Sequence, residues 1–253
     1  LAQAGCHDVA RKYIIYREER AKARRDQKID LDSSDVDWVK KLACKDKDGI
    51  AKTINVEEIV FEIDSCCQNL ANVSSDKIFR ESIKNYYNGI TEVEIQDSNI
   101  LAAKSFVEVE PNYTYAAARL LLLKTYQEAI GHPVSFESIK MEYPIYFEKY
   151  IRKAVDLELL STDLLRFDLK ALGHAIDAKR DFSLKYLGLQ TLYDRYFTHE
   201  EGRRLELPQI FWMRVAMGLA RKEGRQRTDK AIEFYNVLSS LNFMSSTPTL
   251  FNS

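Results

Sequence analysis

Apolar residues recur at spacings of three and four along most of the chain, which is the period of a helix with one buried face. In the first half of the sequence this pattern predicts helices over residues 8–28, 56–70, 75–86, 93–107 and 113–129, with a short one ending near residue 41. The helix over 113–129 is apolar around most of its circumference, so we expect it to be buried, and Gly131 ends it.

The second half is almost wholly helical by the same criterion. The pattern predicts helices over residues 145–157, 163–178, 189–197, 208–221 and 228–241, with a short turn or strand near 182–187. Pro208 fits the first position of its helix, where its missing N–H costs nothing, and Gly224 fits a helix stop. The sequence therefore predicts a mainly α protein.

Two segments depart from the helical pattern. Residues 43–53 contain the turn sequence DKDG between two short strand-like runs, which predicts a β-hairpin. Residues 242–253 change abruptly to Ser, Thr, Pro and Phe, which predicts a strand or an extended segment. We therefore expect a small sheet element ahead of the main helices and an extended one after them.

Composition and charge argue mainly against some classes of function, namely nucleic-acid binding and membrane association. The 253 residues are 45% hydrophobic, enough for one large soluble domain or two smaller ones, and a net charge of −1 gives no reason to expect a nucleic-acid partner. Eight Lys or Arg residues fall within 11–28, where a solvated helix face is favoured over an RNA- or anion-binding one. No membrane association is expected, because Arg214 interrupts the best apolar stretch, 210–220, and no signal peptide begins the chain.

The cysteines do not indicate a redox or metal centre. Cys6, Cys44, Cys66 and Cys67 form neither a CxxC pair nor a Cys/His zinc pattern, and the four histidines are scattered. We therefore expect no metal site and a reducing, cytoplasmic environment. The adjacent cysteines, Cys66 and Cys67, are expected to act as small apolar residues of the core. Both chain ends look like cuts in a longer protein.

Three motifs in the second half resemble one enzyme family. They are KYLGLQTLYDRYF at 185–197, ELPQ at 206–209 and FMSSTPTLFNS at 243–253. In order and spacing they are similar to the helical N-terminal domain and the first barrel strand of class I-like ribonucleotide reductase large (alpha, catalytic) subunits. The resemblance implies that residues 132–242 form this helical domain and that 243–253 begin a ten-stranded α/β barrel.

Residues 32–131 resemble the ATP-cone, a regulatory domain that precedes the catalytic domain in this family. The matching segments are KDG at 47–49, TIN at 53–55, YNGI at 87–90 and PNYTYAAARL at 111–120. The implied fold is a small β-hairpin plus a four-helix bundle. Residues 1–31 resemble the closing part of a preceding cone, so the resemblance implies tandem cones.

The same resemblance implies what the whole enzyme does. It would reduce ribonucleotides to deoxyribonucleotides for DNA synthesis by thiyl-radical chemistry, with ATP and dATP as allosteric effectors. Its partners would be a radical-generating small (beta) subunit that holds the metal, thioredoxin or glutaredoxin as reductant, and further copies of the large subunit. The catalytic cysteines are not identifiable in this chain, so no catalytic residue is assigned and the piece alone is expected to be inactive.

The Thr-Pro pair carries the implied substrate contact. By the resemblance, Thr247 would hydrogen-bond the bound ribonucleotide near its phosphates, with Ser246 as a weaker contact. The residues alone also fit a structural role, in which Thr247 and Thr249 cap or pair at a strand start and Pro248 keeps the preceding residue extended. The sequence leaves both interpretations open.

The cone departs from the family pattern where a nucleotide would bind. Its hairpin reads DKDG where the family has Lys-Arg-Asp-Gly. Glu58 replaces a phosphate-facing Lys, and Glu92 and Gln96 replace a Thr and a His. Each carboxylate facing a triphosphate would weaken binding by about 1 kcal/mol even when well screened. Lys47 and Lys52 are the remaining hairpin cations, and each also fits a solvated surface position, so we expect the cone to bind nucleotide weakly or not at all.

Two functions from other classes compete with this interpretation. A stand-alone nucleotide-sensing regulator would need an intact cone, and the phosphate-facing positions argue against one. A helical protein-interaction module would explain the amphipathic helices, but it would not explain the SSTPT sequence that follows them.

Overall fold

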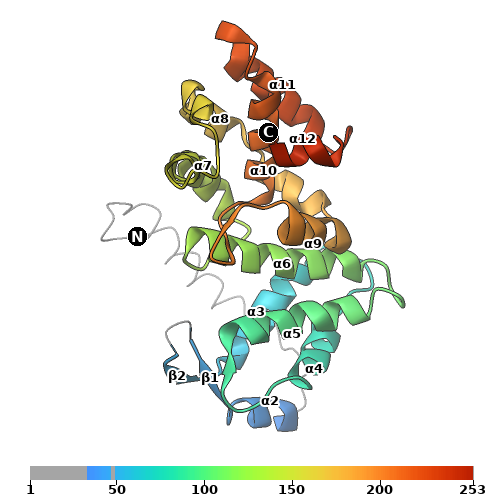
Figure 1. Cartoon of the computed structure of the whole chain (residues 1–253). Coiled ribbons are helices and arrows are strands. Elements are labelled where there is room, and N and C mark those ends of the chain that lie inside the picture. Colours follow the sequence, from blue (N-terminus) through green and yellow to red (C-terminus); the bar gives the residue numbers. More distant parts are fainter. Residues whose placement is uncertain (1–32, 47–48, 253) are drawn as a thin grey trace. The chain divides into compact units, whose positions relative to one another are not determined.

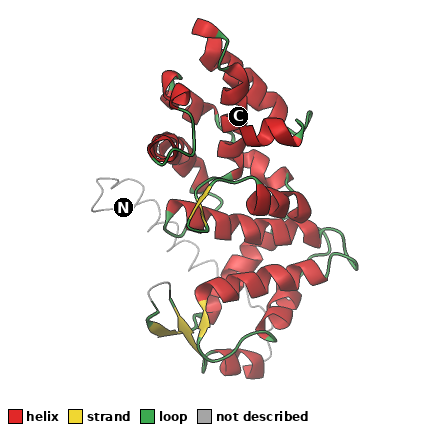
Figure 2. Ribbon diagram, viewed as in Figure 1, coloured by secondary structure: helices red, strands yellow, loops and turns green. Residues whose placement is uncertain are grey.

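A computed structural model describes residues 33–46 and 49–252. Helices dominate this part of the chain (Figure 2), which confirms the mainly α prediction. The chain divides into two compact units, which meet in the sequence at Ala116 and Ala117. The helix predicted over residues 8–28 lies outside the described residues.

The first unit combines a small sheet with helices (Figure 1). Its elements are α2 (Ser33–Val39), β1 (Ala43–Lys45), β2 (Ala51–Thr53), α3 (Val56–Cys67), α4 (Ser75–Ile83), β3 (Ile90–Thr91), α5 (Glu92–Ser105) and the start of α6 (Tyr113–Ile130). The predicted hairpin is confirmed, because β1 and β2 pair antiparallel with Cys44 opposite Lys52. The four helices predicted between residues 56 and 129 are present, with ends that differ by at most three residues.

The strand β3 extends the sheet and was not predicted. It pairs parallel with β1, so the sheet order is β2-β1-β3. Gly89 precedes it with a φ of 88°, a value that favours glycine, and its N–H donates to the Ala43 carbonyl at 2.8 Å. The Asn88 side chain accepts from the Ala43 N–H at 2.9 Å. A two-residue strand shows no alternation of apolar and polar residues, so the sequence pattern could not reveal it.

Side-chain caps fix where the helices of the first unit begin. Asn55 accepts a backbone hydrogen bond at the start of α3, and Ser74 accepts one at the start of α4. Thr91 and Glu94 form a reciprocal capping box at the start of α5. The box fixes the first residue of α5, Glu92, directly after the sheet strand β3.

The core of the first unit holds one polar cluster among apolar side chains. The hydroxyls of Ser82 and Tyr86 both donate to the Asn99 side-chain oxygen, at 2.6 and 3.0 Å, which satisfies this buried group. Cys66 and Cys67 are 0% and 8% exposed. Their burial agrees with the predicted role as small core residues.

The second unit consists of α-helices, short 3-10 helices (labelled η) and one short hairpin. Beyond α6 its elements are α7 (Ile139–Asp156), η1 (Thr162–Arg166), α8 (Leu169–Ala175), η2 (Ala178–Ser183), α9 (Tyr186–Arg195), β4 (His199–Glu200), β5 (Arg203–Arg204), α10 (Pro208–Ala220), η3 (Gly224–Gln226), α11 (Arg227–Ser239) and α12 (Thr247–Asn252). Pro208 occupies the first helical position of α10, as predicted. The helix α7 begins at Ile139 rather than at residue 145, because Pro144 near its start removes only one backbone hydrogen bond.

The prediction of a single helix over residues 163–178 is wrong, because the chain here forms η1, α8 and the start of η2. Side chains cause the breaks. The Asp168 carboxylate accepts from the Ala171 N–H at 2.9 Å and starts α8 anew. The Asp177 carboxylate accepts from the Lys179 N–H at 3.1 Å and starts η2. Aspartate competes in this way with the backbone carbonyls that would continue a helix.

The strand predicted for residues 243–253 is also not what the structure contains. Residues 247–252 form the short helix α12, in which the Thr249 and Leu250 N–H groups donate to the Ser246 carbonyl at 3.0 and 3.3 Å. A strand needs a neighbouring strand to satisfy its backbone groups, and none pairs with this segment among the described residues. Pro248 is compatible with the first turn of a helix, where no N–H is required.

The helix α10 is the central element of the second unit. Nearly all of its side chains are buried, including Trp212 and Phe211. Its Arg214, 2% exposed, donates to the fully buried Glu206 carboxylate at 2.7 Å, which explains how a charge is tolerated inside this apolar helix. No helix in the described part of the chain is long and apolar enough to cross a membrane.

A buried carboxylate ties the helices of the second unit together. Asp181 in η2 is 0% exposed. Its carboxylate accepts from the hydroxyls of Tyr126 in α6 and Tyr143 in α7, at 2.5 and 2.6 Å, and from the Gln209 amide in α10 at 2.8 Å. The Gln209 carbonyl in turn accepts from the Tyr235 hydroxyl in α11 at 2.9 Å. One carboxylate therefore links η2 directly to three helices and through Gln209 to a fourth.

We expect this carboxylate to make stability depend on pH. Burial raises the pKa of Asp181 from 3.8 to about 6 in the folded protein. The folded state holds this proton more tightly than the unfolded chain, so the contribution is fully present below pH 3.8 and is lost as pH rises through about 6. Relative to Asp181→Asn, the wild-type chain should lose roughly 3 kcal/mol of unfolding free energy between about pH 4 and pH 7.

Urea unfolding of both proteins at a series of pH values measures this difference. Asp194→Asn, which removes an exposed carboxylate on α9, controls for the loss of one negative charge. A stability difference between wild type and Asp181→Asn that stays constant over this pH range would contradict the assignment.

Candidate functional site

The first unit places one predicted cation, Lys52, against a carboxylate. Lys52 on β2 forms an ion pair with Glu92, the first residue of α5, and both side chains are partly exposed. The hydrogen bond that Lys52 donates to the Glu92 carboxylate raises the pKa of Lys52 above its usual value. Lys52 is therefore charged and already neutralised by a neighbour. Lys47, the second predicted cation, lies outside the described residues.

The N-terminus of α5 is likewise occupied by the chain's own carboxylates. A helix N-terminus favours anions such as phosphate, because its first N–H groups lack partners within the helix. Here the Glu94 carboxylate accepts from the Thr91 N–H, the Thr91 hydroxyl and the Tyr87 hydroxyl, each at 2.8 Å. These hydrogen bonds, with the one from the Thr91 N–H largest, lower the pKa of Glu94. The position that could attract a phosphate is thus negatively charged.

Further acidic groups surround the hairpin and the start of α3. The Asp46 carboxylate accepts from the Ile50 N–H at 2.9 Å and closes the turn. The Glu58 carboxylate accepts from the Asn55 side-chain amide at 3.2 Å. One turn further along α3, burial raises the pKa of Glu62 to about 7, and the nearby Glu58 carboxylate adds to the shift. These contacts give the acidic residues local roles and add no cation for a triphosphate.

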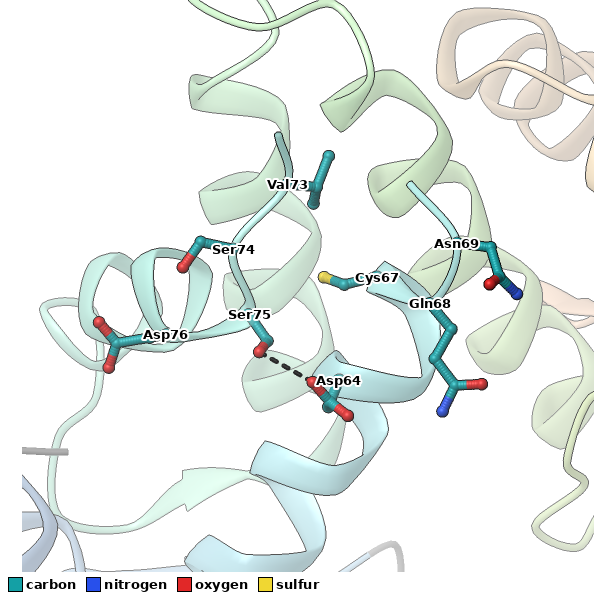
Figure 3. A pocket seen from close by; sticks show the side chains of 8 residues that line it. All are labelled: Asp64, Cys67, Gln68, Asn69, Val73, Ser74, Ser75 and Asp76. Carbon is teal, nitrogen blue, oxygen red and sulfur yellow. Dashed lines mark hydrogen bonds between the residues drawn. The ribbon is translucent and has the colours of Figure 1, made fainter. Parts of the chain in front are cut away.

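A polar pocket of about 520 Å³ opens between the end of α3 and the start of α4 (Figure 3). Its lining residues are Asp64, Cys67, Gln68, Asn69, Val73, Ser74, Ser75 and Asp76. The Ser75 hydroxyl donates to Asp64 at 3.0 Å across it. The lining contains two carboxylates and no cation, so it does not suit a phosphate. No group of three or more His, Cys, Asp or Glu side chains in the described residues is arranged to hold a metal.

The predicted substrate residues lie together at the start of α12. Thr247 and Ser246 are both exposed there, whereas Leu250 of the same helix is 4% exposed and anchors it. The Thr247 hydroxyl lies 3.2 Å from the Tyr196 hydroxyl, just after α9, and the Tyr196 ring stacks on Phe251 with centroids 4.8 Å apart. The sequence motifs contained Tyr196 but gave it no role, because nothing in a motif reveals a contact between segments 51 residues apart.

Comparison with known proteins identifies this second unit. Residues 182–253 match the family described as the ribonucleotide reductase all-alpha domain. Over its whole length the chain is 39% identical to a ribonucleoside-diphosphate reductase subunit alpha of Chlamydia trachomatis and covers 24% of that protein. Along its whole length the chain is therefore similar to ribonucleotide reductase large subunits, and residues 182–253 match their all-alpha domain.

More distant members of the family match a shorter part of the chain. The subunit alpha of Helicobacter pylori is 33% identical over 209 residues, which are 81% of this chain and 25% of that protein. The large subunit of Variola virus is 28% identical over 208 residues, 81% of this chain and 26% of that protein. The chain thus spans about a quarter of the length of these ribonucleotide reductase subunits. The matched range 182–253 contains all three motifs on which the resemblance was based.

We expect the Lys52–Glu92 pair to contribute little to stability. Ion pairs between partly exposed side chains typically contribute about 1 kcal/mol or less, because water and salt screen them. Lys52→Met, Glu92→Gln and the double variant form a cycle that isolates the pair. Urea unfolding should give a coupling of about 1 kcal/mol or less that disappears at high salt. A coupling above about 2 kcal/mol would show that the pair holds the sheet to α5.

Proposed function

We propose that this chain is part of an enzyme that reduces ribonucleoside diphosphates to deoxyribonucleotides for DNA synthesis. The observation that supports the proposal is the whole-length similarity to ribonucleoside-diphosphate reductase subunits. The cysteines of the described residues, Cys44, Cys66 and Cys67, are all buried in the first unit. We therefore assign the thiyl-radical chemistry to other parts of the enzyme.

The partners follow from the same proposal. Radical chemistry on a ribose needs a group that generates the radical, which we assign to a metal-containing small (beta) subunit. Each turnover oxidises a pair of cysteines, so a dithiol protein such as thioredoxin or glutaredoxin must return two electrons. We further propose that large subunits associate with one another and that the enzyme acts in the cytoplasm. For this chain we propose the domain boundaries 1–31, 32–131, 132–242 and 243–253.

Within this enzyme we assign Thr247 and Ser246 to the ribonucleotide site. Their exposure at the start of α12 supports the assignment, because a substrate contact must reach solvent. Buried Leu250 and the stack of Phe251 on Tyr196 hold α12, which begins at Thr247 directly after Ser246. A hydroxyl at this position can donate to a phosphate oxygen, and a hydrogen bond to a charged group contributes about 1.5–3 kcal/mol.

Thr247→Val in the full-length enzyme, assayed with its small subunit, tests this assignment. We expect KM for the ribonucleotide to rise about ten-fold or more, because a hydrogen bond to a charged group is lost. Thr247→Ser keeps the hydroxyl and should keep most of the affinity. The matched control is Thr191→Val, since the Thr191 hydroxyl donates only to the Leu187 carbonyl of its own helix, at 2.8 Å. An unchanged KM for Thr247→Val would overturn the substrate contact.

We also propose that the cone of residues 32–131 has a structural role and binds ATP or dATP weakly or not at all. The pairing of Lys52 with Glu92 and the carboxylates at the start of α5 support this proposal. Allosteric control by ATP and dATP then belongs to another site of the enzyme, and we assign it to the preceding cone that residues 1–31 resemble.

Isothermal titration of the chain with ATP and dATP at near-physiological salt tests the cone. We expect no saturable heat from the wild-type chain. Glu92→Thr removes the carboxylate that pairs with Lys52 and should make binding measurable. Glu108→Thr removes an exposed carboxylate elsewhere in the unit and should not, which separates a local effect from net charge. Saturable binding by the wild-type chain at micromolar nucleotide would show instead that this cone is a working nucleotide sensor.

A further inference from the structure

Tyr196 connects the segment of Thr247 to the core of the second unit. Its hydroxyl lies 3.2 Å from Thr247 Oγ1, and its ring stacks on Phe251 with an interplanar angle of 28°. The same ring meets the edge of Phe211, a fully buried residue of α10, with centroids 6.1 Å apart. One side chain therefore contacts α12 through its hydroxyl and its ring, and contacts the core through its ring.

The backbone of Tyr196 is fixed as firmly as its ring. Tyr196 is the C-cap residue of α9, and its N–H donates to the Leu192 carbonyl at 2.9 Å. Leu192 is itself buried in the core. The phenol hydroxyl is thus presented to α12 from a rigid position, and aromatic contacts limit rotation of the ring.

Either hydroxyl of this contact can be the donor, and one of the two directions suits a phosphate ligand. A threonine hydroxyl has one proton to donate and two lone pairs that can accept. When the Tyr196 hydroxyl donates to Thr247 Oγ1, it occupies one lone pair and leaves the Thr247 proton for another acceptor. An anionic oxygen accepts hydrogen bonds and donates none, so this arrangement matches a phosphate.

We propose that Tyr196 is a positioning residue that orients the Thr247 hydroxyl toward a phosphate oxygen of the ribonucleotide. The inference rests on the proposed substrate contact of Thr247 and assigns it a supporting partner. Tyr196 itself acts through Thr247. Without the phenol hydroxyl, Thr247 would rotate among its rotamers and would lose part of the advantage of being held in the binding geometry.

The test compares Tyr196→Phe, Thr247→Val and the double variant in the full-length enzyme with its small subunit. Tyr196→Phe keeps the ring contacts with Phe251 and Phe211 and removes only the hydroxyl. We expect it to raise KM about three- to ten-fold and to leave kcat within about two-fold, because a binding contact is weakened rather than a transition-state one. The double variant should be no worse than Thr247→Val, since the hydroxyl of Tyr196 acts only through Thr247.

Tyr193→Phe is the matched control. Its hydroxyl lies on the same helix α9 but donates to Glu128 at 2.6 Å, so its removal should leave KM unchanged. The thermal midpoints of all variants are measured alongside, and a lower midpoint for Tyr196→Phe with an unchanged KM would overturn the inference.

The outcomes separate this inference from the proposed function. If Thr247→Val raises KM but Tyr196→Phe does not, or if their effects add in the double variant, Thr247 binds substrate without help from Tyr196 and only the inference is overturned. If Thr247→Val leaves KM unchanged, the substrate contact itself fails and the inference fails with it.

Discussion

The buried Asp181 carboxylate is the constraint on which the second unit depends. A carboxylate buried in the core must receive hydrogen bonds, and α6, α7 and α10 each supply a donor to it. None of these helices can shift by more than a fraction of a hydrogen-bond length without leaving the carboxylate unsatisfied. The effect reaches α12, because Gln209 fixes α10 and Phe211 of the same helix supports the ring of Tyr196.

The first unit satisfies its charges at the surface rather than in the core. In the sheet β1 lies between β2 and β3, and the Lys52 side chain on β2 reaches Glu92, the residue that follows β3. The same capping that starts α5 at a fixed residue brings the Glu94 carboxylate to the helix N-terminus. The side-chain contacts around the hairpin and the start of α5 therefore leave little positive charge there.

Helical periodicity predicted α3, the apolar run that begins at Pro208 predicted α10, and the turn sequence DKDG predicted the hairpin. The sequence pattern failed where a side-chain hydrogen bond or a distant segment of the chain determines the secondary structure. The breaks at Asp168 and Asp177 depend on carboxylates that compete with helical hydrogen bonds, and β3 depends on β1, some 45 residues away in the chain. The acidic residues around the hairpin and the start of α5 could be read from the sequence. The partner of Lys52 and the contact between Tyr196 and the Thr-Pro segment were not, because they require the tertiary structure.

A hydroxyl that binds a ligand must be held in place and must keep unused hydrogen-bonding capacity. Thr91 lacks that capacity, because its hydroxyl accepts from the Glu94 N–H at 3.2 Å and donates to the Glu94 carboxylate at 2.8 Å. Ser82 is buried and donates to Asn99. Thr247 meets both conditions, because within the described residues its exposed hydroxyl contacts Tyr196, whose ring the neighbouring aromatics hold. These two properties are the reason that we place the proposed phosphate contact at Thr247.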